Sequence, residues 1–176
     1  MTTMANDTTD TADTTDIPVR KSITVRATPE RAFRVFTEEF DTWWPRSHHI
    51  GKEPLEKAVV ETRLHGRCYG RSTDGTECDW GTVLVWEPPH RFVLAWQISP
   101  AWQYEPDLAK SSEVEVRFTP EADGSTRVDL EHRLFQRHGI GADGIRKSVD
   151  STGGWAGLLQ LFATRADQTD QSERAN

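Results

Sequence analysis

The sequence predicts an α+β fold, in which one curved antiparallel sheet of about six to seven strands wraps around a long C-terminal helix, with short helices after the first strand. Segments of alternating apolar and polar residues recur between glycine- or proline-containing turns, which is typical of antiparallel strands. A helical apolar stripe follows the first of these segments, and a second, strongly apolar stripe comes after the last. A sheet with both helices on one face buries these surfaces together.

The composition is that of one globular domain with polar ends. The chain has 176 residues, 28% of them charged, and a net charge of −7. Its first sixteen residues are rich in Thr and Asp, contain no Lys or Arg, and bury too little apolar surface to offset the entropy of ordering. We therefore expect a disordered tail over 1–17, a folded domain over 18–166 and a polar tail over 167–176.

Charge and composition also bear on partners and location. Outside the first tail the chain is only mildly acidic, so no nucleic-acid surface is expected. The N-terminus has no basic, apolar leader, and no apolar run approaches the length of a membrane span. We expect a cytoplasmic protein without a membrane partner. Cys68 and Cys78 are then predicted to be thiols rather than a disulfide.

The first elements are a strand and a short amphipathic helix. Residues 19–26 alternate and predict a strand. Thr28 suits an N-cap and Pro29 the first helical position. An apolar stripe at helical spacing follows, formed by Ala32, Phe33, Phe36 and Phe40. Residues 41–45 end the helix, and a polar loop follows.

A series of strands fills the middle of the chain. The densest strand-forming run, WGTVLVWEPPHRFVLAWQI, is interrupted by Pro88 and Pro89, which no strand can pass through, so it predicts a hairpin. The Asp74-Gly75 pair indicates another tight turn before it. The predicted strands are 58–64, 67–71, the two arms of the hairpin between about 77 and 98, 112–118 and 126–135.

The last part of the chain holds a loop, a glycine-rich segment and the helix. The loop at 99–110 carries Trp102, and the segment 139–144 is predicted to be flexible. The final helix begins near Trp155, and Gly153-Gly154 before it lets another backbone approach closely. Its stripe at i, i+3, i+4 and i+7 consists of Trp155, Leu158, Leu159 and Phe162.

Five segments in this order resemble a known family. They are SITVRATPERAFRVFT, WWP, RLHGRCYGRSTDG (where His65-Gly66 replaces the usual double glycine), WGTVLVWEPPHRFVLAWQI and GGWAGLLQLF. Together they resemble the helix-grip, START-like (SRPBCC) superfamily, in its branch named after activators of the ninety-kilodalton heat-shock-protein ATPase, over residues 19–166. The resemblance implies a fold with a cavity between sheet and C-terminal helix. It leaves function open, because this fold hosts binding proteins, co-chaperone domains and enzymes.

Several side chains are candidates for the wall of such a cavity. Indole rings can line a site for a flat hydrophobic ligand, although ordinary core packing is the simpler explanation for Trp96 and Trp155. Trp102 lies on a loop, where core packing does not require it. The predicted ligand-binding residues are Trp44, His48, Arg63, Trp80, Trp96, Trp102, His132 and Trp155.

The polar candidates each have an alternative explanation. The pair His48-His49 is either a polar contact at a pocket mouth or, more simply, a solvated loop pair. His132 lies on the inward face of its strand and is either a ligand contact or a core histidine with a hydrogen-bond partner. Arg63 binds an acidic ligand group or forms a surface ion pair.

No residue stands out as catalytic. The sequence has no Gly-x-Ser-x-Gly element and no phosphate-binding glycine loop. His65, Cys68 and Cys78 lack the second ligand pair that zinc sites show, so neither a metal nor another cofactor is expected.

The leading hypothesis is the binding of a small hydrophobic or aromatic ligand in the cavity. The alternative is a protein-interaction module of the chaperone-activator kind, with the chaperone or a second copy of the chain as partner. The resemblance implies that eukaryotic activators carry a further N-terminal domain that contacts the chaperone. Only a disordered tail is expected at that place here, which counts against the chaperone-activator hypothesis. A weaker alternative is a cyclase or hydrolase that uses His132 with a carboxylate.

Overall fold

The structure is a computed structural model that describes residues 14–174. Residues 1–13 of the expected N-terminal tail, and residues 175–176 at the other end, lie outside this range. Thr14–Asp16 forms a single 3-10 turn, η1, and the backbone carbonyl of Ile17 accepts a hydrogen bond from Arg146 Nε at 2.9 Å. No helix in the described range is long and apolar enough to cross a membrane.

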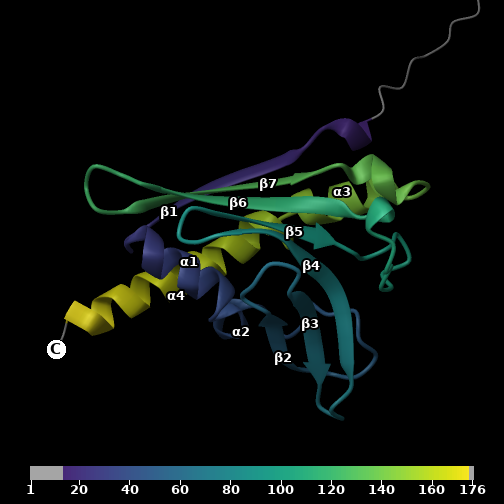
Figure 1. Cartoon of the computed structure of the whole chain (residues 1–176), viewed down its shortest axis with the longest axis horizontal. Helices are drawn as coiled ribbons and strands as arrows, with labels where there is room; N and C mark the ends of the chain where they lie inside the picture. The colour runs from purple at the N-terminus through teal and green to yellow at the C-terminus, as the bar shows by residue number, and fades with distance from the viewer. Residues whose placement is uncertain (1–13, 175–176) are drawn as a thin grey trace, which may run out of the picture.

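Seven antiparallel strands form one curved sheet, in the order β1-β7-β6-β5-β4-β3-β2 (Figure 1). Every strand pairs with its neighbour in the chain except β1, which pairs with β7 and so brings the start of the domain beside its last strand. The predicted α+β fold is confirmed. The strands are β1 Val19–Val25, β2 Leu55–Val60, β3 Arg67–Ser72, β4 Glu77–Glu87, β5 Arg91–Trp96, β6 Ser112–Pro120 and β7 Thr126–Arg133.

The helices cover one face of the sheet, and α4 crosses that face beside α1 (Figure 1). The first helix begins as predicted, with Pro29 in its first turn and the Thr28 side chain accepting a hydrogen bond from the Arg31 amide at 3.3 Å. The helices are α1 Pro29–Thr37, α2 Phe40–Trp43, α3 Ala142–Asp150 and α4 Trp155–Arg174, with 3-10 turns η2 at Leu108–Lys110 and η3 at Phe135–His138.

An aromatic core joins α1, α2 and α4 to the sheet. Phe162 of α4 lies 4.9 Å from Phe36 and 5.7 Å from Trp43, measured between ring centroids. Phe36 also contacts Phe92 of β5 at 5.3 Å. These rings are almost completely buried, and burying each contributes roughly 1.5–3 kcal/mol. This core fixes the middle of α4 on the sheet, so the first turn of α4 has a defined position.

Several predicted boundaries differ from the structure, and three of the differences have a clear physical cause. Strand β2 ends at Val60, because the side chain of Glu61 accepts a hydrogen bond from the Arg67 amide at 2.7 Å and closes a turn. The segment predicted to be flexible at 139–144 runs into α3, whose apolar residues Ile145 and Val149 are buried. Their burial outweighs the low helix propensity of the glycines nearby.

The third difference concerns the C-terminal tail expected at 167–176. Helix α4 continues to Arg174, so the expected boundary lies inside a helix. Extending an existing helix adds one hydrogen bond for each residue fixed and needs no apolar stripe. Asp167 also accepts a hydrogen bond from the Arg26 amide at 2.8 Å, which joins the helix to the end of β1.

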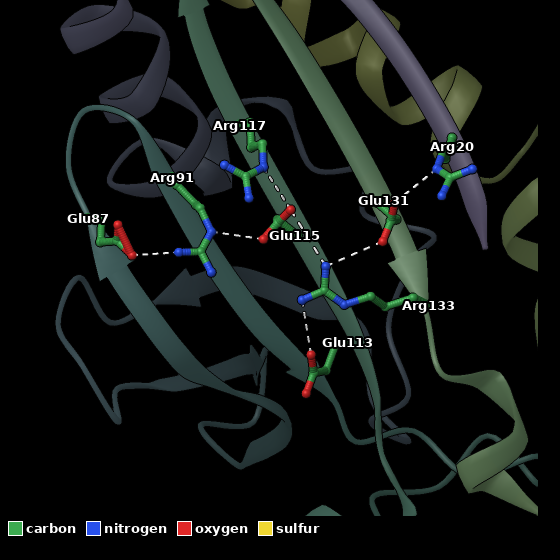
Figure 2. A network of polar contacts seen from close by, with 8 residues as sticks. All are labelled: Arg20, Glu87, Arg91, Glu113, Glu115, Arg117, Glu131 and Arg133. Carbon is green, nitrogen blue, oxygen red and sulfur yellow. Dashed lines mark hydrogen bonds and ion pairs between the residues drawn. The ribbon is translucent and has the colours of Figure 1, made fainter.

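Charged side chains cover the outer face of the sheet (Figure 2). Glu115 of β6, which is only 8% exposed, lies at the centre of this network. It accepts hydrogen bonds from Arg91 Nε at 2.8 Å and from Arg117 Nε at 2.9 Å. Arg133 of β7 forms an ion pair with Glu115 and further ion pairs with Glu113 of β6 and Glu131 of β7. Positive and negative groups alternate across the strands, so this face carries no basic stripe.

Candidate ligand-binding site

A cavity of about 270 Å³ opens between the sheet and the start of α4. Its wall comes from the loop after α2, from the ends of β4 and β5, from the loop that follows β5 and from the junction of α3 with α4. Small-molecule sites begin at about 300 Å³, so the space is of the right order for a compact ligand. Five tryptophans contribute to the wall, namely Trp44, Trp80, Trp96, Trp102 and Trp155.

Four of these indoles form a closed ring of contacts. The centroids of Trp44 and Trp80 lie 6.1 Å apart, and the two ring planes differ by only 6°. Trp80 contacts Trp96 at 5.9 Å, Trp96 contacts Trp155 at 6.0 Å, and Trp155 returns to Trp44 at 6.4 Å. The ring is therefore assembled from four separate parts of the chain. Large aromatic surfaces held this way suit stacking and edge contacts with a flat ligand.

Hydrogen bonds hold the loop after α2 against the junction of α3 and α4. The indole N–H of Trp44 donates to the carbonyl oxygen of His48 at 2.8 Å. His48 Nε2 lies 2.9 Å from the carbonyl oxygen of Gly153, and because a carbonyl only accepts, Nε2 carries the proton. His48 Nδ1 then accepts from the Ser47 hydroxyl at 3.0 Å. His48 thus ties one side of the cavity to the other.

Trp102 lies on the rim loop, which we define as residues 98–104. A bridge between Ile98 and Tyr104 closes this loop, and the Trp102 amide donates to the carbonyl oxygen of Ser99 at 2.8 Å. The loop holds Trp102 at φ +58°, in the left-handed region that bulky side chains seldom adopt. Its indole is 45% exposed although it lines the cavity. Backbone strain of this kind is concentrated at functional sites.

His132 is completely buried and does not line the cavity. The indole N–H of Trp155 donates to His132 Nδ1 at 3.1 Å. An indole nitrogen only donates, so His132 carries its proton on Nε2 and donates it to Ser112 Oγ at 2.7 Å. Of its two predicted roles, the structure therefore shows the core histidine with hydrogen-bond partners. The same bonds contradict a pairing of His132 with a carboxylate.

The chain of hydrogen bonds continues to His138. The Ser112 hydroxyl donates to His138 Nε2 at 2.8 Å, and the Ser112 amide donates to the same atom at 3.2 Å. Burial lowers the pKa of His132 well below its ordinary value, and the charge on His138 would lower it further. Burial also lowers the pKa of His138, to about 4. Both imidazoles are neutral at pH 7, and together with Ser112 they hold Trp155 in place.

The other polar candidates do not line this cavity, although Cys78 lines a smaller hollow beside it. Arg63 is exposed and, among the residues that the structure describes, forms a weak surface pair with Glu61 at 3.4 Å, which is the simpler of its two predicted roles. Cys68 and Cys78 are free thiols, and burial raises the pKa of the Cys68 thiol far above its ordinary value. Within the described residues no group of three or more His, Cys, Asp or Glu side chains is arranged to hold a metal ion.

The structure thus brings together most of the predicted site residues. Those around the cavity are Trp44, His48, Trp80, Trp96, Trp102 and Trp155, whereas Arg63 and His132 lie elsewhere. Sequence reasoning missed Ser148 and Val149, because α3 was not expected there. His49 was considered together with His48 but was not among the selected ligand-binding residues, and it too lines the cavity. Whether these residues bind a ligand remains a prediction.

Comparison with known proteins places this geometry in a family. Residues 26–166 match the family model described as Activator of Hsp90 ATPase homolog 1-like protein. Among curated proteins, none matches the chain.

Solved structures also match the chain. One is an anthrahydroquino-gamma-pyrone synthase, Txn09, with 42% identity over 84% of this chain and 95% of that one, at a TM-score of 0.60. Another is CalC, a self-sacrificing resistance protein from Micromonospora echinospora, with 29% identity over 88% and 96% and a TM-score of 0.63. A Nitrosomonas europaea protein shares the fold at 15% identity, with coverage of 88% and 96% and a TM-score of 0.61. The chain therefore belongs to the Activator of Hsp90 ATPase homolog 1-like family, a branch of the START-like superfamily.

Proposed function

We propose that this protein binds a planar, polycyclic aromatic molecule of the anthraquinone class in the tryptophan-walled cavity. The observation that carries the proposal is the closed ring of Trp44, Trp80, Trp96 and Trp155, joined at the mouth by the exposed Trp102. A wall built almost entirely of aromatic faces favours a ligand that is itself flat and apolar.

The name of one relative supports the ligand class. The structure that is 42% identical to this chain is an anthrahydroquino-gamma-pyrone synthase. That name describes a fused aromatic ring system of the shape that the cavity would accept.

Titration with anthraquinone and with 2-hydroxyanthraquinone, followed by tryptophan fluorescence and calorimetry, tests the proposal. We expect saturable quenching with one ligand per chain. Trp102→Ala should weaken binding by about tenfold, because stacking of one aromatic ring is worth roughly 0.5–1.5 kcal/mol in addition to the buried area. The matched control is Trp86→Phe, since Trp86 packs on Phe33 and Phe92 outside the cavity. An absence of binding, or equal losses in both variants, would contradict the proposal.

A second candidate is closure of a γ-pyrone ring on such a ligand, favoured by the activity named for the same relative. In that reaction the phenolic oxygen of an o-hydroxyaryl 1,3-diketone adds to the distal carbonyl carbon, and one water molecule leaves. Incubation of an anthraquinone that bears this side chain, followed by mass spectrometry, tests it. Product formation at the rate seen without protein would leave binding alone as the function.

The chaperone-activator alternative stays a prediction that rests on the family description. It is tested by adding the protein to the cognate chaperone and measuring the ATPase rate. A rise in that rate which saturates with protein concentration would favour this alternative, with or without ligand binding. Sedimentation of the free protein at the same concentrations tests the predicted homodimer.

A further inference from the structure

The polar atoms of the cavity wall indicate a more specific ligand, on the assumption that the proposed binding function is correct. An indole N–H donates a hydrogen bond and cannot accept one. The five indoles of the wall therefore offer no acceptor. Those of Trp44 and Trp155 are already bonded, to the carbonyl oxygen of His48 and to His132 Nδ1. Acceptor nitrogens in this wall can come only from its two histidines, His48 and His49.

His48 has no free nitrogen. Its Nε2 donates to the carbonyl oxygen of Gly153 at 2.9 Å, and its Nδ1 lies 3.0 Å from Ser47 Oγ. Both positions are therefore occupied by bonds that hold the wall together. His48 is a structural link rather than a contact for a ligand.

His49 differs from its neighbour. Its Nδ1 lies 2.9 Å from the carbonyl oxygen of Gly51, so Nδ1 carries the proton and Nε2 of the neutral ring keeps its lone pair. No hydrogen bond to Nε2 is formed by the residues that the structure describes. The two nitrogens of an imidazole point in nearly opposite directions, so Nε2 points away from the carbonyl oxygen of Gly51. His49 is exposed and lines both the cavity and a smaller hollow beside it, whereas Gly51 lines only the smaller hollow.

We infer that His49 Nε2 accepts a hydrogen bond from a hydroxyl group of the ligand, which makes the ligand a hydroxylated polycyclic aromatic rather than a bare hydrocarbon or quinone. Of the ring nitrogens that line the cavity, this is the one with an unshared lone pair. A phenolic hydroxyl supplies the matching donor in the plane of a flat ring system. His49 then sets which face and edge of the ligand lies toward the loop after α2.

The test compares two ligands that differ only in one hydroxyl, anthraquinone and 2-hydroxyanthraquinone. We expect His49→Leu to weaken binding of 2-hydroxyanthraquinone by about tenfold and to change binding of anthraquinone by less than about twofold, as the loss of one hydrogen bond implies. His49→Gln places an acceptor oxygen near the position of Nε2 and should restore most of the affinity. His90→Ala is the matched control, because His90 is an exposed histidine on the turn between β4 and β5.

The outcomes separate this inference from the function on which it rests. If the wild-type protein binds neither ligand, the proposed function itself is contradicted. If it binds both and His49→Leu weakens them equally, or weakens neither, the role of His49 is overturned while the proposed function stands. If His49→Gln behaves like His49→Leu, the hydrogen bond is not the cause of any loss.

Discussion

At the scale of single residues, the orientation of Trp155 depends on a chain of hydrogen bonds that can run in only one direction. Its indole only donates, so the proton positions on His132, Ser112 and His138 follow from it in turn. The last atom, His138 Nδ1, is buried without a partner among the described residues. All three groups must be neutral for the chain to form, and neutrality is what burial of the two histidines favours.

This series of hydrogen bonds predicts that the protein loses stability in mild acid. The pKa of each histidine is lower in the folded protein than its unfolded value of about 6.5. Below pH 6.5 the unfolded state therefore binds more protons than the folded state. As a result, the free energy of unfolding decreases as the pH is lowered. The slope should reach about 1.4 kcal/mol per pH unit for fully buried His132 and less for the partly exposed His138.

Urea unfolding between pH 7.5 and 5 measures this slope. His138→Gln should make it shallower, because one of the two titrating groups is removed. His90→Ala, at an exposed position, should leave it unchanged. Equal slopes for the wild type and His138→Gln would show that His138 does not contribute to the loss of stability in acid.

Two adjacent glycines at the cavity wall give a second prediction at this scale. A Cβ on Gly154 would collide with the carbonyl group of Val149, whereas a Cβ on Gly153 would meet nothing within 4 Å. We expect Gly154→Ala to lower the free energy of unfolding by about 1–3 kcal/mol, as strain in a packed site does. Gly153→Ala should change it by less than about 0.5 kcal/mol. Equal losses in thermal or urea unfolding would show that the junction of α3 and α4 is not tightly packed there.

At the scale of elements, the sheet is stabilised on its outer face by the charge network around Glu115. Burial raises the pKa of this carboxyl, but hydrogen bonds from Arg91 and Arg117 and the charge of Arg133 lower it by more, so the pKa lies below its ordinary value. The three arginines come from β5, β6 and β7. All three pair with this one carboxylate, and Arg91 and Arg133 also pair with other glutamates at the edges of the network (Figure 2).

Removing that charge should therefore cost more than removing a peripheral one. We expect Glu115→Gln to destabilise the protein by about 1–3 kcal/mol, since a nearly buried partner of several cations is lost. Glu87→Gln, which breaks the half-exposed pair with Arg91, should cost less than about 0.5 kcal/mol. Urea unfolding of both variants measures these changes in the free energy of unfolding. Similar changes in the two variants would mean that the network acts only as isolated surface pairs.

Elements with strong local signals were predictable from the sequence, and those that depend on distant contacts were not. Thr28 and Pro29 predict the start of α1, and the Pro88-Pro89 pair predicts the turn between β4 and β5. Helix α3 was missed because glycines surround its first residues. It forms because Ile145 and Val149 are buried where α3 packs against η1 and β1 at the start of the chain and against η3 and α4 beside it.

The candidate site shows the same division. Its tryptophans could be selected from the sequence because few roles suit so many indoles. Strand alternation placed His132 inward, but it could not distinguish the cavity wall from the layer behind it. Nor could it identify the free nitrogen of His49, because that depends on a carbonyl group which the loop positions only after folding.

At the scale of the whole molecule, the fold divides α4 into two functions. Its middle, around Phe162, completes the aromatic core with α1 and α2. Its first turn, at Trp155, forms part of the cavity wall together with β4, β5 and the loop after α2. The aromatic core fixes the position of the helix on the sheet, and the cavity lies beside its first turn. This division is the basis of the claim that the cavity is a binding site.

The most direct test of that claim is a titration with 2-hydroxyanthraquinone followed by the seven indole N–H signals in a ¹H–¹⁵N NMR spectrum. Five indoles line the cavity, whereas Trp43 is bonded to the Val35 carbonyl oxygen in the core and Trp86 packs on Phe33. We expect the five cavity signals to shift and saturate together while those of Trp43 and Trp86 stay in place. Unchanged cavity signals, or shifts confined to Trp86 and Trp43, would contradict it.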